Sequence, residues 1–357
     1  MENMVEDNSL DFFINKKIFI TGHTGFKGSW LSYILDRNKS IVKGYSLSPN
    51  TNPSLFTKLK FSSQFTSVIS NINDYSKLKE EIVSFSPDII FHLAAQPIVI
   101  ESYKQPRYTF DTNFTGTLNI LEILREMDSK CACVFVTTDK VYYNDDTNNK
   151  FKEKDKLGGK DPYSASKAAS EILINSYLNS YFLESNISIA SVRAGNVIGG
   201  GDWSSYRLIP DIINSHINNI KLRIRYPNAV RPWQHVLEPL FGYLSLAKKL
   251  YLNKSKYSGA WNFGPEEDDI KAVKDVIKIA QDEGLSLDYS ENKKIKFHES
   301  KFLSLDISKA KKTLLWKPKW NSETAIKKTI QWYLNFYKKN NTEKLMENDI
   351  KSYLKNE

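Results

Sequence analysis

Cysteine and histidine are scarce in this sequence, which limits the redox and metal chemistry open to the protein. The chain has 2 cysteines and 5 scattered histidines among its 357 residues. Cys131 and Cys133 lie one residue apart beside an apolar run, so their side chains share one face of a predicted strand. A metal site would need more ligands nearby, and a cytosolic chain keeps such thiols reduced. We therefore predict two reduced core thiols and no metal site.

The sequence also lacks a long hydrophobic run and a leader pattern. No apolar stretch approaches the roughly 20 residues that span a bilayer. The segment from Met1 to Asp11 is acidic and polar, without a basic stretch followed by an apolar one. We expect a cytoplasmic protein with no membrane partner.

Charge of one sign is not concentrated anywhere, although the net charge is +9. The lysines are spread along the chain and accompany 41 acidic residues. This distribution, together with the lack of a nucleic-acid-binding motif, argues against a nucleic-acid partner. An anionic small molecule fits the basic balance better.

A glycine-rich turn near the N-terminus is the strongest local signal. Gly22, Gly25 and Gly28 follow a short apolar run, and the apolar residues after them have helical spacing. This pattern predicts strand, tight turn and helix. Glycine lets the backbone approach a ligand, and the helix N-terminus offers free N–H groups to a pyrophosphate. The spacing differs from the G-x-G-x-x-G of many dehydrogenases, so a turn used only for close packing is the alternative.

Predicted strands and helices alternate through the first half of the chain. Strands are expected at 18–20, 40–47, 68–69, 88–95, 133–140 and 187–192, with helices at 76–85 and 109–125. Alternation of this kind predicts a Rossmann-type, doubly wound parallel sheet in an α/β fold, with ligands at the carboxyl ends of the strands. The second strand ends at Tyr45-Ser46, which offers neither a carboxylate for NAD nor an arginine for NADP. NAD is therefore favoured only by default. We expect His92 to be a satisfied core histidine.

Polar residues at the end of one strand and the start of the next helix form a candidate catalytic group. Thr138, Asp139 and Lys140 end the strand at 133–140, and Asp161-Pro162 is a good start for a helix that carries Tyr163 and Lys167 one turn apart. The Lys167 ammonium and a positive nicotinamide ring would both lower the pKa of Tyr163. Tyr163 could then take a proton from a substrate hydroxyl, with Thr138 hydrogen-bonded to the same oxygen.

The regular alternation ends after residue 192, where a smaller, discontinuous C-terminal substrate-binding domain is expected to begin. We predict a cofactor-binding domain at 12–195 and about 230–265, with the segment from Trp261 to Pro265 returning to the sheet. The substrate-binding domain takes 196–229 and about 266–340. Residues 341–357 form a charged tail, which we expect to be a frayed surface helix.

The combination of motifs resembles the extended branch of the short-chain dehydrogenase/reductase superfamily, and within it the CDP-glucose 4,6-dehydratases. The resemblance runs from about Lys16 to Trp332 and is carried by five segments. They are Thr21-Gly-His-Thr-Gly-Phe-Lys-Gly-Ser-Trp-Leu31, Leu93-Ala-Ala-Gln-Pro97, Thr138-Asp-Lys140, Ala194-Gly-Asn-Val-Ile-Gly-Gly-Gly-Asp-Trp203 and Val230-Arg-Pro-Trp-Gln-His-Val236. The first and last of these are specific to that enzyme within the superfamily.

The resemblance implies an internal redox cycle on CDP-glucose, in deoxysugar biosynthesis for surface polysaccharide. NAD+ takes the hydride from C4 with Tyr163 as base, water leaves from C5 and C6, and the hydride returns to C6. Asp139 would protonate the departing C6 hydroxyl. Related dehydratases have a carboxylate as C5 base at the next position, where this chain has Lys140. Lys140 is either that base, with a lowered pKa, or a charged stabiliser of the C4 enolate.

The remaining candidate residues bind the cofactor or the nucleotide sugar. For the cofactor they are Gly22, Thr24, Gly25, Phe26, Lys27, Gly28, Ser46, Asn71, Ile72, Leu93, Ala94, Ala95, Thr112, Tyr163 and Lys167. For the substrate they are Gln96, Arg193, Asn196, Arg207, Arg231 and Trp233. Guanidinium groups match phosphate oxygens two at a time, and Arg231 is the best candidate because its motif binds the nucleotide in the family.

Two other functions are considered. A 4-epimerase of a nucleotide sugar would share Tyr163, Lys167 and the cofactor, but it would have no use for an Asp139 acid. A non-catalytic NAD-binding sensor would be expected to lack the tyrosine or the lysine, and both are present. Cytidine over guanosine, uridine or thymidine rests on the resemblance alone. Relatives pair through the helices that correspond to 109–125 and 163–181, so we expect a homodimer.

Overall fold

The computed structural model describes residues 10–145, 150–266, 268–291 and 303–355. Seven strands form one parallel sheet in the order β11-β6-β5-β4-β1-β2-β3. Their bounds are β1 Lys17–Thr21, β2 Ile41–Ser46, β3 Phe65–Ile69, β4 Ile89–His92, β5 Cys131–Val136, β6 Ile187–Ala194 and β11 Gly259–Phe263. The predicted α/β fold class is confirmed, and so is the return of Trp261 to the sheet.

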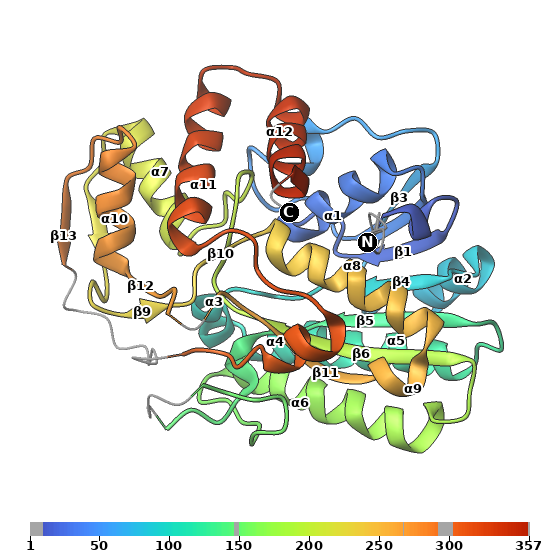
Figure 1. The fold of residues 1–357 in the computed structure, drawn as a ribbon. Coiled ribbons are helices and arrows are strands. Elements are labelled where there is room, and N and C mark those ends of the chain that lie inside the picture. The colour runs from blue at the N-terminus through green and yellow to red at the C-terminus, as the bar shows by residue number, and fades with distance from the viewer. Residues whose placement is uncertain (1–9, 146–149, 267, 292–302, 356–357) are drawn as a thin grey trace, which may run out of the picture.

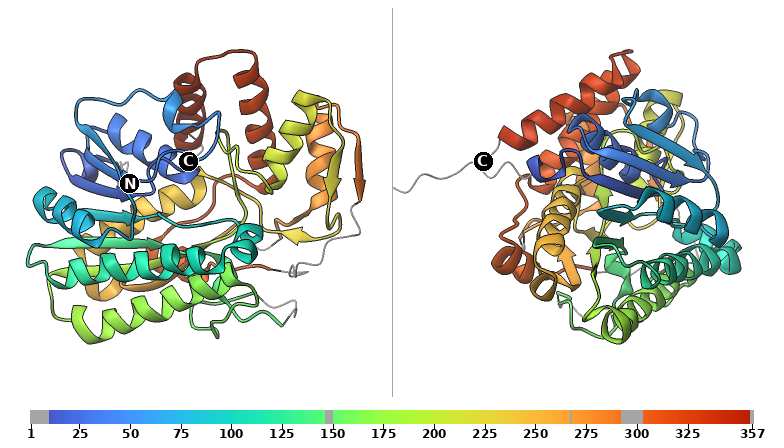
Figure 2. Two further views of the ribbon diagram at one scale, coloured as in Figure 1. Left: turned by 180° about the vertical axis from the view of Figure 1, so that it is seen from behind. Right: turned by 90° about the vertical axis from the view of Figure 1, so that its right-hand side faces the viewer.

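Helices cover both faces of this sheet (Figures 1 and 2). Alternate residues of β4 separate the two cores: Ile89 and Phe91 join one apolar cluster and Ile90 joins the other. The first cluster includes α1 (Phe26–Arg37) and α8 (Leu237–Leu252), and the second includes α2 (Tyr75–Phe85), α5 (Gly116–Arg125) and α6 (Pro162–Tyr177). This period-two division is what a strand buried on both faces requires.

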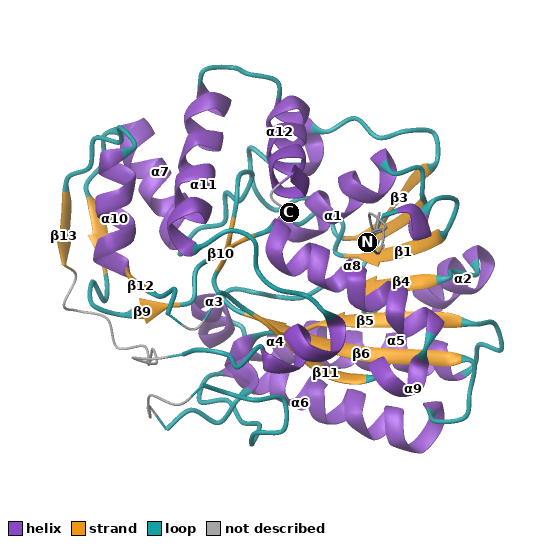
Figure 3. Cartoon of the chain, in the orientation of Figure 1, coloured by secondary structure: helices purple, strands orange, loops and turns teal. Residues whose placement is uncertain are grey.

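Smaller elements lie beyond the carboxyl ends of the central strands, on the left of Figure 3. Their bounds are α7 Leu208–Asn218, β8 Leu222–Ile224, β9 Val230–Arg231, β12 Lys271–Ala272, α10 Val273–Asp282, β13 Tyr289–Glu291 and α11 Ser322–Tyr337. The other short elements are α3 Val99–Lys104, α4 Pro106–Phe110, β7 Val197–Ile198, β10 Gln234–His235 and α9 Lys254–Tyr257. Apolar residues of α7, β8, α10 and α11 join the first core cluster, so the two parts of the protein share a core. The domain boundaries given above stay a prediction.

Two sequence predictions need correction. The helix expected at 109–125 is formed by α4 and α5 with a π-helical turn at Asp111–Thr115 between them. The tail forms α12 (Thr342–Lys355), but it is not a frayed surface helix, because Met346 is 0% and Tyr353 2% exposed. Its sparse apolar residues are spaced to face the core, which the charged composition concealed.

The side chains that were expected to be inert are buried and satisfied. Cys131 and Cys133 are free and buried. His92 exchanges hydrogen bonds with Thr21 at 2.8 Å and Thr117 at 3.2 Å, as expected of a core histidine. Among the described residues there is no group of three or more potential metal ligands. Within the same ranges, no helix combines the length and the apolar character needed to cross a membrane.

Candidate active site

A single cleft of about 870 Å³ runs along the carboxyl ends of the sheet strands and continues between α7, β8 and β9. We call the part lined by the glycine-rich turn and the ends of β2 and β4 the first arm. The part lined by residues 203–211, 222–226 and 229–233 is the second arm. Thr138, Asp139, Lys140, Tyr163 and Lys167 line the cleft between the two arms.

The first arm is built around a turn that only glycine allows. Gly22 has φ +76°, and a Cβ on Gly28 would lie 2.1 Å from the Gly22 carbonyl oxygen. The turn leads directly into the N-terminus of α1. Thr24 ties the turn to the end of β2 through a 2.9 Å hydrogen bond with Ser46. The arm therefore offers unpaired backbone N–H groups at a fixed helix N-terminus, which suits a pyrophosphate.

Every residue predicted to bind a cofactor lines this cleft. The set is Gly22, Thr24, Gly25, Phe26, Lys27, Gly28, Ser46, Asn71, Ile72, Leu93, Ala94, Ala95, Thr112, Tyr163 and Lys167. Burial, followed by the charges of Arg207 and Lys167, lowers the pKa of Lys27 to about 7. Lys27 can therefore be neutral near neutral pH.

Tyr163 and Lys167 lie one turn apart on α6, which begins as predicted. The Asp161 carboxylate caps the helix by accepting a 2.9 Å hydrogen bond from the Ser164 backbone N–H. Lys167 Nζ donates to the Val136 carbonyl oxygen at 3.1 Å, and burial lowers the pKa of Lys167 to about 8. Burial raises the pKa of Tyr163 to about 12, although a hydrogen bond with Thr138 opposes this. The sequence predicted a lowered pKa for Tyr163. Without the cofactor the pKa is raised instead, because the effect of burial is larger than the opposing effects of the neighbouring groups.

The polar residues that follow β5 meet Tyr163. They do not end the strand as predicted for 133–140, because β5 stops at Val136 and Asp139–Val141 form a 3-10 turn that Thr138 caps. Thr138 Oγ1 donates to Asp139 Oδ1 at 3.0 Å, so the chain Tyr163, Thr138 and Asp139 is linked by hydrogen bonds. Asp139 is 2% exposed, and a Cβ on Gly195 would lie 1.7 Å from its Oδ2 atom. Lys140 is half-buried and lines the cleft beside it. Hydrogen bonds bring Tyr163, Thr138 and Asp139 together at one point of the cleft, and Lys140 is the next residue in the chain.

Five of the six predicted substrate ligands line the cleft: Gln96, Asn196, Arg207, Arg231 and Trp233. Arg207 Nη1 donates to Asp202 at 2.6 Å, which fixes its guanidinium at the junction of the arms. Arg231 is 4% exposed, and its Nη1 donates to the Val230 carbonyl oxygen at 2.7 Å. Trp233 Nε1 donates to the Lys271 carbonyl oxygen at 3.1 Å. Trp203, which could either line the site or fill the core, does both, since it lines the cleft and its ring packs against Trp332.

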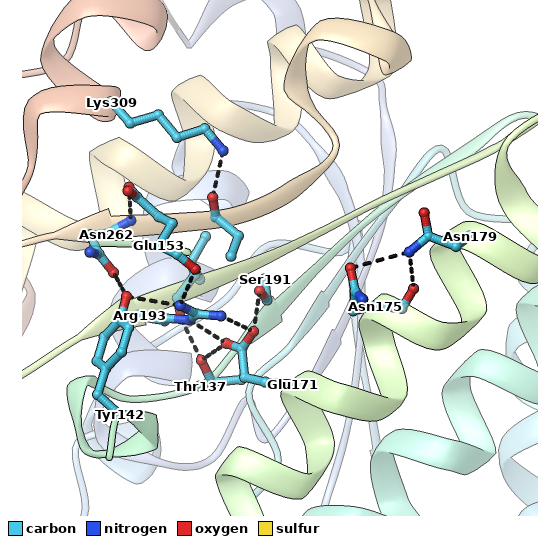
Figure 4. A network of polar contacts seen from close by, with 12 residues as sticks. Thr137, Tyr142, Glu153, Glu171, Asn175, Asn179, Ser191, Arg193, Asn262 and Lys309 are labelled. Atoms are coloured by element: carbon cyan, nitrogen blue, oxygen red, sulfur yellow. Dashed lines mark hydrogen bonds and ion pairs between the residues drawn. The ribbon is translucent and has the colours of Figure 1, made fainter. Parts of the chain in front are cut away.

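Arg193 is the exception, and its assignment as a substrate ligand is corrected here. Its side chain does not line the cleft but forms a buried ion pair with Glu171 of α6, with an N–O distance of 2.8 Å (Figure 4). It also donates to the Tyr142 hydroxyl at 2.8 Å. Arg193 has the same strand parity as Ile187 and Ile189, which face α6. The residue therefore holds β6 to the helix that carries Tyr163.

Sequence reasoning missed several polar residues of the second arm. Asp211, Arg223, Arg225 and Tyr226 all line it. Burial raises the pKa of Asp211 to about 6, against the opposing charge of Arg225. The sequence did contain a pattern that could have identified two of them. Arg223 and Arg225 alternate with two apolar residues, which predicts a strand with one polar face.

Comparisons with known proteins agree with this arrangement. The family model described as GDP-mannose 4,6 dehydratase matches residues 19–329. A CDP-glucose 4,6-dehydratase of Salmonella typhimurium is 43% identical over 339 residues, covering 92% of this chain and 93% of the relative. A dTDP-glucose 4,6-dehydratase of Escherichia coli is 27% identical over 349 residues, covering 89% and 93%.

Solved structures share the fold. An epimerase of Methanothermobacter thermautotrophicus superposes with a TM-score of 0.79 at 20% identity, covering 92% of this chain and 95% of that one. A dTDP-glucose 4,6-dehydratase of Bacillus anthracis, solved in complex with NAD, gives a TM-score of 0.74 at 22% identity, covering 90% and 98%. From the family match and the 43% identity, the chain belongs to the nucleotide-sugar 4,6-dehydratases of the extended short-chain dehydrogenase/reductase superfamily.

Proposed function

We propose that the protein catalyses the NAD-dependent dehydration of CDP-D-glucose to CDP-4-dehydro-6-deoxy-D-glucose. The observation that carries the proposal is the hydrogen-bonded group of Tyr163, Thr138 and Asp139, with Lys140 next to it in the chain and lining the same cleft. An oxidation requires only the tyrosine and its lysine, whereas an elimination also requires an acid and a base. The choice of CDP-glucose rests on the Salmonella typhimurium relative. We place the product in deoxysugar biosynthesis for a surface polysaccharide.

The first arm fits NAD. A Cβ on Gly28 would collide with the Gly22 backbone, so the close turn at the start of α1 requires glycine, and its helix N-terminus offers backbone N–H groups to a pyrophosphate. Tyr45 and Ser46 line the end of β2, and no arginine among the lining residues of this arm is placed to hold a 2′-phosphate. When bound in this arm, NAD+ would supply the acceptor for the C4 hydride and the donor of the same hydride to C6.

Oxidation at C4 depends on proton removal from the substrate hydroxyl. Burial raises the pKa of Tyr163 to about 12, so its phenol is protonated in the chain alone. Tyr163 would accept the C4 hydroxyl proton as a phenolate, after its own proton has left, and the positive charge of the bound cofactor would favour that form. Lys167 supplies a second positive charge one turn away. Thr138 is hydrogen-bonded to both Tyr163 and Asp139, so it holds these two side chains in position relative to each other.

Elimination across C5 and C6 uses the other two groups. Asp139 gives a proton to the C6 hydroxyl, which leaves as water. Lys140 takes the C5 proton, which the C4 ketone has made acidic. Lys140→Ala would then lose exchange of the C5 proton with solvent, and wild-type exchange in that variant would contradict the base role.

The second arm receives the nucleotide because the first is filled by the cofactor. Arg207 and Arg231 both line the cleft, and we propose that their guanidinium groups bind the diphosphate. Asp211, Arg223, Arg225 and Tyr226 form the polar end of this arm, where the base would lie.

We further propose a homodimer that pairs through α5 and α6. The large apolar side chains of Ile172, Tyr181 and Leu183 are 60%, 52% and 62% exposed on or just beyond α6. Both helices lie on the outer side of the sheet in Figure 2, with none of the described elements over them. Burial of these side chains by a second copy would remove an exposed apolar patch. Sedimentation or light scattering of the purified protein tests this pairing.

Incubation with CDP-glucose and NAD+ tests the activity. Loss of one water from the sugar, with the alkali-induced absorbance of a 4-keto sugar and no net reduction of the cofactor, is the expected result. Turnover of GDP-, UDP- or dTDP-glucose instead would identify another nucleotide. Inversion at C4 without loss of mass would indicate the epimerase, and cofactor binding without turnover would indicate a sensor.

A further inference from the structure

Two of the residues proposed to act on the substrate stand just beyond the parallel sheet. β5 pairs with β6 along its whole length, and the Thr137 N–H then donates to the Val192 carbonyl oxygen at 2.9 Å. Residues 138–141, which we call the β5 turn, follow outside this ladder and include Thr138 and Asp139. The position of the β5 turn therefore depends on how the end of β5 is anchored.

The end of β5 is anchored to α6 by two successive contacts. Lys167 Nζ donates a hydrogen bond to the Val136 carbonyl oxygen at 3.1 Å. The Thr137 hydroxyl donates to Glu171 Oε1 at 2.5 Å. Tyr163, Lys167 and Glu171 follow one another at intervals of four residues, so they share one face of α6. The face of the helix that carries the proposed base therefore also holds the strand end that leads into the β5 turn.

Glu171 is itself a fixed group, because donors hold both of its oxygens (Figure 4). Arg193 of β6 donates to the two oxygens at 3.0 and 2.8 Å, and the Ser191 hydroxyl donates to Oε2 at 2.7 Å. Burial raises the pKa of the Glu171 carboxyl, but the Arg193 charge and the hydrogen bonds together hold it below its ordinary value. The carboxylate is therefore ionised and only accepts hydrogen bonds, so the hydroxyls of Thr137 and Ser191 are both donors.

Only one of these two hydroxyls is next to the β5 turn. Thr137 directly precedes Thr138, whose hydroxyl donates to Asp139 at 3.0 Å. Ser191 lies inside β6, where β5 pairs with it on one side and β11 on the other, so the sheet fixes its position without help from its side chain. Displacement of a reacting group by about 1 Å can cost 10²-fold in rate, so the anchor at Thr137 bears on the reaction.

We propose that Thr137 and Glu171 are positioning residues, which hold the β5 turn in place against Tyr163. Thr137 lines the cleft, but its hydroxyl proton is directed to Glu171 and not to a ligand. The inference rests on the proposed dehydratase function. It gives the buried pair of Glu171 and Arg193 a part in the rate of the reaction as well as in stability.

Thr137→Val tests the proposal because it removes the hydroxyl and leaves a side chain of similar size. We expect kcat with CDP-glucose and NAD+ to fall about 10- to 100-fold, the cost of misplacing a reacting group by up to about 1 Å. KM should be unchanged, because the hydroxyl does not bind the substrate. The appearance of reduced cofactor in a single turnover should slow by a similar factor, since oxidation at C4 uses Thr138 and Tyr163.

Two further variants separate positioning from a general loss of stability. Ser191→Ala removes the other hydroxyl from the same buried carboxylate, so denaturant unfolding should show a comparable loss of stability while kcat equals that of the wild type. Thr137→Ser keeps the hydroxyl and should restore most of kcat. A fall in kcat that Ser191→Ala shares, or that Thr137→Ser does not relieve, would overturn the proposal. Unchanged kcat in Thr137→Val would do the same, as would a raised KM with unchanged kcat, which would indicate direct contact with the substrate.

The outcome for the proposed function is read from the wild type. If the wild type acts on none of CDP-, GDP-, UDP- and dTDP-glucose, the dehydratase function fails and the positioning role fails with it. If the wild type turns over one of these sugars and Thr137→Val does so equally fast, only the positioning role fails.

Discussion

The two arms of the cleft are built in different ways. The first arm comes from a contiguous turn between β1 and α1, with short additions from the ends of neighbouring strands. The second comes from α7, β8 and β9 together with the loop residues 203–206, in a part of the chain without regular alternation. The first arm presents mainly the backbone N–H groups of its turn to a ligand, whereas the second arm presents polar and charged side chains.

This difference has a functional consequence. Backbone N–H groups at a helix N-terminus recognise a pyrophosphate whatever the side chains are, so one cofactor can serve many enzymes. Side chains such as Asp211 and Arg225 can change without loss of the fold, so the second arm is where a preference for one nucleotide can be set. Substitutions can therefore test separately the residues that carry out the reaction, those that stabilise the fold and those that bind the substrate.

The largest effect is expected from Tyr163→Phe, which acts where the arms meet. Removal of the hydroxyl leaves no acceptor for the C4 proton, and kcat should fall about 10³-fold, within the range of general-base catalysis. Cofactor affinity, measured by fluorescence titration, should stay near that of the wild type. Tyr177→Phe on the same helix lies outside the cleft and serves as the control. Retained turnover in Tyr163→Phe would mean that another group takes the proton.

Arg193→Met should have the next largest effect, on stability rather than on substrate binding. It leaves the Glu171 carboxylate buried without its ion-pair partner, which typically costs about 3–5 kcal/mol of unfolding free energy. Denaturant unfolding measures this loss. The double variant Arg193→Met with Glu171→Gln should recover part of it, since no buried charge is then left. A raised KM with unchanged stability would instead support the original assignment of Arg193 to the substrate.

The sequence predicted the first arm far better than the second for a physical reason. Gly22, Gly25 and Gly28 act through backbone geometry that is local in the chain, and all the cofactor candidates reached the cleft. The position of Asp211 or Arg225 depends on how α7 and β8 pack on a shared core, which no local pattern reports. Arg193 lies between these two cases. The alternation along its strand indicates which face of the sheet it lies on, but it does not indicate that Glu171 is its ion-pair partner.

Substitution in the second arm should affect KM more than kcat. Arg231→Gln removes a guanidinium predicted to bind the diphosphate, and hydrogen bonds between charged groups are worth about 1.5–3 kcal/mol. KM for CDP-glucose should rise about 10- to 100-fold, with kcat within a few fold of the wild type. Steady-state kinetics give both values. Arg223→Gln, at an exposed position of the same arm, should have a smaller effect. A 10- to 100-fold fall in kcat with an unchanged KM would contradict the assignment of Arg231 to substrate binding.

Counted per carboxyl group and per pH unit, the smallest effect is expected on the support of the first arm by α12. Tyr33 and Arg37 of α1 donate hydrogen bonds to Glu347 and Glu343 of α12, at 3.0 Å and 2.9 Å. Burial raises the pKa values of two carboxyls that hold α12 in place, Glu238 and Asp349, to about 7 each. The folded state therefore binds more protons than the unfolded state between the ordinary carboxyl pKa and pH 7.

Stability should consequently fall as the pH rises from about 4.5 to 7 and then level off, because these carboxyls ionise at lower pH in the unfolded chain. Each group contributes a slope of at most about 1.4 kcal/mol per pH unit. Asp349→Asn removes one of the two groups at constant shape and should reduce the slope, which thermal unfolding across this pH range would measure. An unchanged slope in Asp349→Asn would show that the carboxyl is already ionised in the folded protein, held by Lys328 at 3.8 Å. In that case Asp349 would not contribute to the pH dependence, and the slope would come from other groups such as Glu238.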